Sequence, residues 1–365
     1  MYYEIIIHKF IEINFKIDIR RGVFMKEKQS IKELQPYIVN PTICSVKLDS
    51  NEGSKDLFKN LVKELGEEFY LNVYPDDSYL DLKKAISDYI GCKTSNICVG
   101  NGSSELLDLC VKTFVDNNEL LLSLDPTFSL YSIYAKIVNG RYMGAGEGNN
   151  FTIDTKEVIK TIKENNPKLT IICNPNNPTG TVIKRDKVLE IVKSTDEIVI
   201  VDEAYMEFGD ESVVDEIENY KNLIVLKTLS KAFSMAGIRT GYMIANEELT
   251  KTVEKVRPPY NLNSISAFLA TKALQHKEKM LSYVIEVKEE RGRLFNSLLD
   301  MNVKVFPSGA NFIFFRSNID SLEDKLVKED VLIKKFGGKL DNHYRVTIGS
   351  KHENSKFIEA MKKFC

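Results

Sequence analysis

The chain has 365 residues, which is long enough for a large buried core and two domains. Apolar residues make up 43% and charged residues 28%, and the formal net charge of -2 gives no basic excess that would indicate a nucleic-acid partner. The apolar runs are too short to span a bilayer, and the six cysteines form no CxxC pair or Cys/His cluster, so we expect a cytoplasmic protein with reduced thiols, no membrane contact and no metal site.

Residues 1–24 alternate apolar and polar side chains from Ile11 to Ile19, which is the period of a strand. They lack the uninterrupted apolar stretch and the small-residue cleavage site of a signal peptide. A second methionine, Met25, follows at once. We therefore interpret residues 1–24 as an N-terminal extension and assign no function to it.

From about residue 95, short apolar runs alternate with polar clusters and helical stretches; the runs lie at 97–99, 120–124, 169–173, 198–201 and 223–226. This alternation is typical of βαβ units, so the sequence predicts an α/β fold in which residues 61–265 form a large domain with a mainly parallel central sheet flanked by helices. Ligands bind outside the carboxyl ends of strands in such sheets. The polar clusters that follow all five runs therefore indicate the walls of one site.

The pattern changes after Asn263. A charged amphipathic stretch at 277–301 is followed by strand candidates at 303–306, 311–315, 331–333 and 344–348 and by a terminal helix at 353–364. This order predicts a smaller α+β domain over residues 266–365. We expect residues 25–60 to pack with that small domain.

Lys231 follows the last apolar run of the predicted sheet. A lysine at the end of a buried strand is partly desolvated, which lowers the pKa of its amine and frees the amine to attack a carbonyl. Arg239 lies eight residues further on, and Thr228 and Ser230 add hydroxyl groups, so phosphate ligands surround this lysine. The commoner role of a single lysine is that of a solvated loop residue, and the neighbouring groups are what argue against it.

Two further strand ends carry polar residues. Asp202 is placed either to cap a helix or to pair with a pyridinium nitrogen, and Tyr205 lies three residues later. Gly102, Ser103 and Ser104 precede a helical pattern, where free backbone N–H groups bind anions. Neither a Gly-Lys-Ser/Thr ending nor a GxGxxG order is present, which argues against a nucleotide.

Three segments carry a resemblance to a known family: Asn-Pro-Asn-Asn-Pro-Thr-Gly at 174–180, Val-Asp-Glu-Ala-Tyr at 201–205, and the stretch from Ser230 to Arg239. In this order and spacing they resemble the fold-type-I aminotransferases that depend on pyridoxal phosphate. Within that family the chain is most similar to the histidinol-phosphate aminotransferases, through segments at 34–37, 47–52, 72–75, 311–316 and 344–349.

The resemblance implies a role for each matching residue. The catalytic residues are Lys231, which forms the Schiff base with the cofactor and acts as general base, Asp202, which holds the pyridinium nitrogen, and Tyr205, which bonds the ring's phenolic oxygen together with Asn177. Phe128 stacks on the ring at a position where tyrosine is common. The cofactor phosphate is held by Gly102, Ser103, Ser104, Thr228, Ser230 and Arg239, with Tyr74 supplied by the partner subunit of a homodimer.

The substrate residues that the resemblance implies are Tyr37, which covers the substrate, Asn51, and the two arginines Arg316 and Arg345, which hold its phosphate end. The family usually reads Asn-Glu-Asn-Pro where this chain has Asn-Glu-Gly-Ser at 51–54, so the shape of that loop stays open.

The implied reaction interconverts histidinol phosphate and 2-oxoglutarate with imidazole acetol phosphate and glutamate, as part of histidine biosynthesis. A threonine-phosphate decarboxylase of cobalamin synthesis and an aromatic or broad-range amino acid aminotransferase are alternatives on the same fold. A regulator that binds the cofactor without catalysis is a third. Tyr37 favours the first interpretation, and the intact set of Lys231, Asp202 and Arg239 argues against a silent relative.

Overall fold

The computed structural model describes residues 27–32, 34–36, 40–66 and 70–365. The chain divides into two compact units, residues 1–36 and 37–365. In the first unit the described residues form a turn, in which the backbone N–H of Ile31 donates to the carbonyl oxygen of Lys28 at 2.9 Å. The extension predicted at residues 1–24 lies outside the described residues. The second unit contains both sheets and the candidate site.

The strands are β1 (Val46–Leu48), β2 (Ile97–Gly100), β3 (Leu120–Leu124), β4 (Arg141–Ala145), β5 (Leu169–Cys173), β6 (Ile198–Asp202), β7 (Leu223–Thr228), β8 (Gly241–Ala245), β9 (Lys304–Phe306), β10 (Phe312–Arg316), β11 (Val331–Lys335) and β12 (His343–Thr347). All five apolar runs predicted as strands of the large sheet are strands.

The α-helices are α2 (Leu80–Ile90), α3 (Ser103–Phe114), α4 (Leu130–Ile137), α5 (Thr155–Asn165), α6 (Arg185–Lys193), α7 (Glu247–Glu254), α8 (Ser264–Gln275), α9 (Lys277–Asp300), α10 (Leu322–Lys328) and α11 (Lys351–Lys362). Short 3₁₀ helices are η1 (Lys59–Glu64), η2 (Thr94–Asn96), η3 (Asn149–Phe151), η4 (Met206–Phe208), η5 (Val214–Glu216), η6 (Ala236–Ile238) and η7 (Gly338–Leu340).

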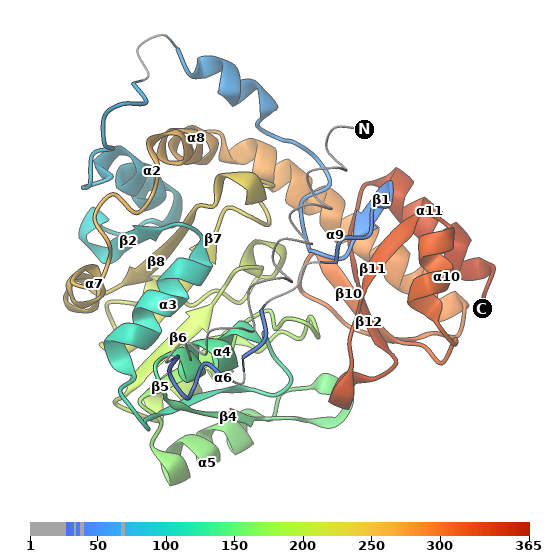
Figure 1. The fold of residues 1–365 in the computed structure, drawn as a ribbon, viewed down its shortest axis with the longest axis horizontal. Coiled ribbons are helices and arrows are strands. Elements are labelled where there is room, and N and C mark those ends of the chain that lie inside the picture. The colour runs from blue at the N-terminus through green and yellow to red at the C-terminus, as the bar shows by residue number, and fades with distance from the viewer. Residues whose placement is uncertain (1–26, 33, 37–39, 67–69) are drawn as a thin grey trace, which may run out of the picture. The chain divides into compact units, whose positions relative to one another are not determined.

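The large sheet has the order β2-β8-β7-β6-β5-β3-β4, and all neighbours are parallel except β8, which runs antiparallel to β2 and β7. Its central strands are buried over their whole length because helices cover both faces, which explains their continuous apolar sequences. Figure 1 shows α3 and α4 on one side of this sheet. Side chains from that face, including Ile200 and Leu226, form one core cluster with α3 and α4, and the alternate residues Val201 and Val225 belong to the other cluster.

The small sheet has the order β1-β11-β12-β10-β9, in which β1 is parallel to β11 and the other pairs are antiparallel. Strand β1 comes from the N-terminal part of the chain, so that segment adds an edge strand to the C-terminal sheet. Helices α10 and α11 lie together on one side of this sheet (Figure 1). The predicted α/β fold, with a mainly parallel sheet and a smaller α+β part, is confirmed.

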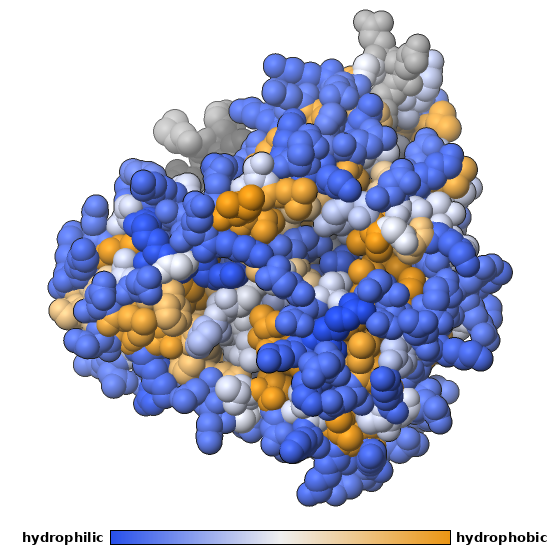
Figure 2. Space-filling view, turned by 180° about the vertical axis from the view of Figure 1, so that it is seen from behind, coloured by the Kyte–Doolittle hydropathy of each residue, from blue (hydrophilic) through white to orange (hydrophobic). Residues whose placement is uncertain are grey.

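The face in Figure 2 is mostly hydrophilic, and its apolar side chains gather in several separate patches. Within the described ranges, none of the helices has the length and apolar character needed to cross a bilayer. The same residues contain no cluster of three or more His, Cys, Asp or Glu side chains that could hold a metal ion.

Candidate active site

The candidate site is a cavity of about 750 Å³ outside the carboxyl ends of β3, β5, β6 and β7, closed on its other side by residues of the small sheet. This is where parallel sheets of this kind bind their ligands. The sequence-predicted residues that line it are Asn51, Ser103, Ser104, Phe128, Asn177, Asp202, Tyr205, Thr228, Ser230, Lys231, Arg239 and Arg345. Residues that are more than 200 positions apart in the sequence therefore meet in one cavity.

Lys231 lies just after β7, at the start of the loop that leads to η6. Its Nζ donates to the carbonyl oxygen of Ser50 at 3.2 Å and lies 5.8 Å from the centre of the Tyr205 ring. Burial, and after it the positive charge of Arg345, lowers the pKa of the Lys231 amine to about 7, against an opposing effect of Glu52. A neutral amine is thus available near neutral pH, as nucleophilic attack on a carbonyl requires.

Asp202 is the last residue of β6 and is 4% exposed. Its carboxylate accepts hydrogen bonds from the Tyr131 hydroxyl at 2.8 Å and from the backbone N–H of Ala204 at 3.1 Å. Burial raises the pKa of this carboxyl, and the two hydrogen bonds oppose that effect. In the described part of the chain, no cation is among the groups that stabilise the Asp202 carboxylate. The Asp202 carboxylate thus faces the cavity with no cation of the described residues paired to it. Such a buried carboxylate suits a positively charged group on a ligand.

A candidate anion site lies between the start of α3 and the loop after β7. The N-cap residue of α3 is Gly102, which has no side chain to cap the helix and leaves the first backbone N–H groups available. A Cβ at Gly102 would lie 2.7 Å from an Nη atom of Arg239, and its φ is +83°, so only glycine suits this position. Arg239 also donates to the Ser230 hydroxyl at 3.4 Å, and Thr228 donates to the same oxygen at 3.0 Å. Hydroxyls, backbone amides and a guanidinium thus converge as phosphate ligands do.

Arg345 lies in β12 and is 8% exposed. Its guanidinium donates to the Asn177 side-chain oxygen at 2.6 Å and to the carbonyl oxygen of Asp49 at 2.7 Å. Its Cα partner in β11 is Lys334, which also lines the cavity. Like charges directly opposite one another destabilise a sheet, so this pair indicates an anionic ligand between them.

Tyr205 and Asn51 join the small sheet to the base of the cavity. Tyr205 is buried, its hydroxyl accepts a hydrogen bond from the Asn51 side-chain N–H at 3.1 Å, and burial raises its pKa to about 12. Asn51 has a left-handed backbone with φ of 54° and accepts a hydrogen bond from Thr347 at 3.2 Å. The phenol of Tyr205 is therefore a neutral hydrogen-bonding group at physiological pH.

The side chains of two sequence-predicted residues, Arg316 and Tyr74, do not line the cavity. Arg316 is the exposed last residue of β10 and lines a different hollow together with Lys304. It lies two residues beyond Phe314, the strand partner of Arg345, so it points from the same face but about 6–7 Å further along the strand. Tyr74 is 76% exposed and stacks on Tyr260 with ring centres 4.5 Å apart. Tyr37 lies outside the described residues.

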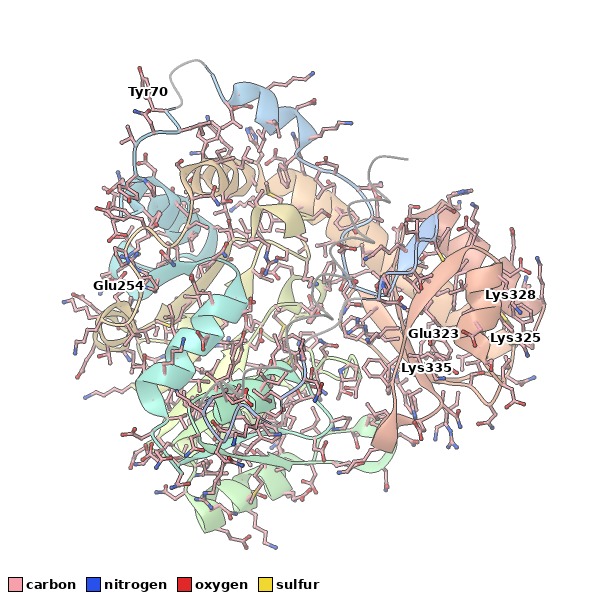
Figure 3. The ribbon with its side chains drawn as sticks, in the orientation of Figure 1. Tyr70, Glu254, Glu323, Lys325, Lys328 and Lys335 are labelled. Carbon is pink, nitrogen blue, oxygen red and sulfur yellow. The ribbon has the colours of Figure 1, made fainter. Side chains whose placement is uncertain are left out.

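Sequence reasoning missed Lys334, Lys335 and Tyr131, which also line the cavity. Figure 3 labels Lys335 at the end of β11. Tyr131 lies three residues after Phe128, a spacing that puts both side chains on one side of a helical turn, and their rings meet edge to face at 5.6 Å. The helical spacing from Phe128 could have predicted Tyr131. Lys334 and Lys335 could not be predicted in this way, because the position of β11 at the cavity depends on its register with β12.

The family model for aminotransferases of class I and II matches residues 45–361. The chain belongs to this family. The histidinol-phosphate aminotransferases of Clostridium novyi and Pyrococcus furiosus are both 36% identical to it, over 92% of this chain and 96% and 97% of theirs. Within the family, the chain groups with these histidinol-phosphate aminotransferases.

Solved structures agree with this placement. The histidinol-phosphate aminotransferase of Clostridium acetobutylicum is 32% identical, with a TM-score of 0.81 over 87% of this chain and 98% of that one. The enzyme of Sinorhizobium meliloti, solved in complex with pyridoxal-5'-phosphate, has a TM-score of 0.86 over 94% of this chain and all of that one. At 19% identity, this second likeness shows the fold.

The cofactor of this family is pyridoxal phosphate, and the residues present fit it. The buried Asp202 suits a protonated ring nitrogen, the amine of Lys231 suits the aldehyde, and the glycine-lined cradle at Arg239 suits the phosphate. A Cβ at Gly102 would intrude on that cradle, so the backbone itself is shaped for an anion.

Proposed function

We propose that this chain transfers the amino group of histidinol phosphate to 2-oxoglutarate, forming imidazole acetol phosphate and glutamate in histidine biosynthesis. The observation that carries this proposal is that two neighbouring cations, Arg345 and its strand partner Lys334, line the same cavity as Lys231. A phosphate at one end of the substrate and an amine at the other fit the two ends of this arrangement. The likeness to histidinol-phosphate aminotransferases supports the same substrate.

Arg345 is the main ligand that we propose for the substrate phosphate. Its position is fixed by the oxygens of Asn177 and Asp49, and it lies near the rings of Phe312 and Phe336, at 5.3 and 5.9 Å. A guanidinium held in this way loses little conformational freedom when an anion binds. In the second half-reaction the same charge would receive a carboxylate of glutamate.

Bound pyridoxal phosphate supplies a ring that withdraws electrons from the carbon next to the amino group. Lys231 Nζ would act as the general base that takes the proton from that carbon and passes it on to the cofactor. The lowered pKa of the Lys231 amine leaves a substantial fraction of it unprotonated near pH 7, and this fraction is able to accept the proton. The hydrogen bond from Lys231 Nζ to the carbonyl oxygen of Ser50 holds the amine in place before a ligand binds.

The remaining site residues would hold the cofactor. We assign the ring nitrogen to Asp202, the phenolic oxygen to Tyr205 and Asn177, and the ring face to Phe128. We assign the cofactor phosphate to Gly102, Ser103, Ser104, Thr228, Ser230 and Arg239. Asn51, which contacts Tyr205 and lines the cavity, is assigned to the substrate, and Tyr37 keeps its expected role as a cover. Arg316 receives no substrate role, because it does not line the cavity.

We also propose a cytoplasmic homodimer in which Tyr74 reaches the cofactor phosphate of the partner subunit. Exposed large side chains gather in the segment before α2, at Tyr70, Leu71, Val73 and Tyr74. Figure 3 labels Tyr70 in this segment and shows its side chain pointing outward. Such a patch indicates a protein interface.

The domain division that we propose keeps residues 61–265 as the cofactor domain and 266–365 as the small domain, with residues 25–60 packed on the latter. The parallel pairing of β1 with β11 supports the last assignment for Val46–Leu48, which belong to the second unit.

Complementation tests the proposed function. In a bacterial strain that lacks histidinol-phosphate aminotransferase, the chain is expected to restore growth without histidine, and the Lys231→Ala variant is expected not to. Failure of a well-expressed, cofactor-loaded wild-type chain to restore growth would contradict the proposal.

A further inference from the structure

Tyr131 is a buried residue of α4 to which neither the resemblance nor the proposed function gives a role. It is 0% exposed, although its helix lies at the edge of the cavity, and it lines that cavity beside Asp202. Its hydroxyl donates to one oxygen of Asp202 at 2.8 Å, and its ring packs edge to face on Phe128 at an interplanar angle of 88°. One side chain therefore contacts the residue assigned to the ring nitrogen and also the residue assigned to the ring face.

We propose that Tyr131 is a positioning residue that holds Asp202 and Phe128 in place for the cofactor ring and keeps the Asp202 carboxylate ionised. This inference rests on the proposed function, because the ring in question belongs to the cofactor of that reaction. A purely structural tyrosine would fill space; this one also places a hydroxyl on a buried carboxylate.

The groups that face Asp202 have opposite effects on the pKa of its carboxyl. Burial raises the pKa of the Asp202 carboxyl, and the negative charge of Glu203, the next residue, raises it further. The hydrogen bonds from Tyr131 and the Ala204 backbone act in the other direction. From the neighbouring strand β5 the facing group is Cys173, whose pKa burial raises to about 12, so its thiol stays neutral.

Tyr205 faces Asp202 from the loop after β6, and it is also neutral because burial raises its pKa to about 12. The charge of Glu203 is partly balanced by Lys227, whose Nζ lies 3.1 Å from the Glu203 carboxylate. Lys227 and Thr228 are adjacent in β7, so their side chains point to opposite faces of the sheet. Among these side chains of the described residues, Tyr131 is therefore the one that donates a hydrogen bond to the Asp202 carboxylate. Burial raises the pKa of the Tyr131 phenol well above its usual range, so it remains a donor at any physiological pH.

The test is the affinity for pyridoxal phosphate as a function of pH, with Tyr131→Phe compared with wild type. The substitution keeps the ring and removes the donor, so the pKa of Asp202 rises and the carboxylate is lost at a higher pH on acidification. The fall in cofactor affinity on acidification, here called the acid limb, should therefore move to higher pH. At a fixed pH on that limb, the affinity should be roughly tenfold to a hundredfold lower than in wild type. The pH midpoint of the bound cofactor's visible absorbance should move in the same direction.

Tyr79→Phe is the matched control. Tyr79 is also buried, and its hydroxyl both donates to and accepts from the Leu262 backbone at 3.0 Å, but it does not line the cavity. We expect an unchanged acid limb for this variant. A shift of equal size in both variants, or an unchanged limb in Tyr131→Phe, would overturn the positioning role.

A perturbation of opposite sign covers the case in which Tyr131→Phe does not fold. A 3-fluorotyrosine at position 131 keeps the side chain and makes the phenol more acidic and a stronger donor, so the acid limb should move to lower pH. A limb that stays in place or moves to higher pH would contradict the proposal. Cofactor binding does not involve histidinol phosphate, so either result leaves the proposed substrate to be judged by its own assay.

Discussion

The guanidinium of Arg345 and the amine of Lys231 share one cavity, and after burial the charge of Arg345 is the largest influence that lowers the pKa of Lys231 to about 7. The residue proposed to bind the substrate phosphate thus also helps to keep the catalytic amine neutral. An anion bound at Arg345 would offset that charge, so substrate binding and the basicity of Lys231 are linked.

This link predicts the pH dependence of the enzyme. At low pH the Lys231 amine is protonated and cannot accept a proton, so kcat should rise with pH. Because a bound substrate phosphate offsets the charge of Arg345, the midpoint of this rise should lie above the value of about 7 for the ligand-free protein. Arg345→Gln removes a neighbouring cation, which raises the pKa of Lys231 and moves this limb to higher pH. Steady-state rates at saturating substrate from pH 5.5 to 9 provide the measurement. A limb that stays in place in Arg345→Gln would show that the two groups are not coupled.

The partly buried amine of Lys231 should also cost stability in the cofactor-free protein. Its folded pKa of about 7 lies below the usual lysine value of 10.5, so the cost is fully present below pH 7 and disappears as pH rises toward 10.5. Lys231→Met should therefore raise the free energy of unfolding by roughly 1–3 kcal/mol at pH 6, with a smaller gain at pH 9. Denaturant titrations at both pH values check this. Lys251→Met, on the exposed face of α7, is the control and should show no such pH-dependent gain.

Arg345 should control affinity for the phosphate end of the substrate. Arg345→Gln is expected to raise KM for histidinol phosphate by roughly tenfold to a hundredfold, since a hydrogen bond to a charged group is lost. Lys334→Gln should raise it by less, because this lysine acts as a mobile point charge. Arg316→Gln compares the structure with the sequence-based expectation: its position outside the cavity predicts a change of less than about threefold. An increase in KM in Arg316→Gln as large as that in Arg345→Gln would show that Arg316 belongs to the substrate site.

Covalent attachment of the cofactor should depend on Lys231 alone. Borohydride reduction of the loaded wild-type protein, followed by peptide mass spectrometry, should place the cofactor on Lys231. Lys231→Ala should carry none and lose roughly 10²–10⁴ in rate from the missing general base, with a further loss from the missing attachment. Lys251→Ala should resemble the wild type. Reduced cofactor found on another lysine would refute this assignment.

The proposed dimer predicts that cofactor affinity depends on protein concentration. If Tyr74 completes the phosphate site of the partner subunit, dilution to monomer should release pyridoxal phosphate, and Tyr74→Phe should weaken binding without changing the dimer. Sedimentation velocity combined with cofactor fluorescence measures both quantities. A fully loaded, active monomer would contradict the shared site.

Much of this site could be predicted from the sequence because its residues follow strands. Asp202 and Thr228 end β6 and β7, and Lys231 comes soon after the end of β7, so the periodic apolar runs are enough to locate these residues. The alternation of buried runs with helices likewise predicts the parallel sheet. The antiparallel direction of β8 was not predicted, because strand direction depends on the connection rather than on the apolar pattern.

The residues that sequence reasoning missed depend on tertiary register. Lys334 reaches the cavity because it is paired with Arg345 across two strands, and Arg316 misses it because β10 carries it two residues past Phe314. A strand pattern shows which residues share a face and leaves open how far along the neighbouring strand each one lies. The carbonyl oxygens of Asp49 and Ser50, which hold Arg345 and Lys231, carry no side-chain signal at all.

The central claim is tested most directly by single-turnover half-reactions of the cofactor-loaded enzyme with histidinol phosphate, threonine phosphate and phenylalanine, followed by absorbance and by product mass. We expect fast conversion with histidinol phosphate, imidazole acetol phosphate as the product, and full recovery of the starting spectrum on addition of 2-oxoglutarate. Release of carbon dioxide from threonine phosphate, or fast conversion with phenylalanine alone, would contradict the claim.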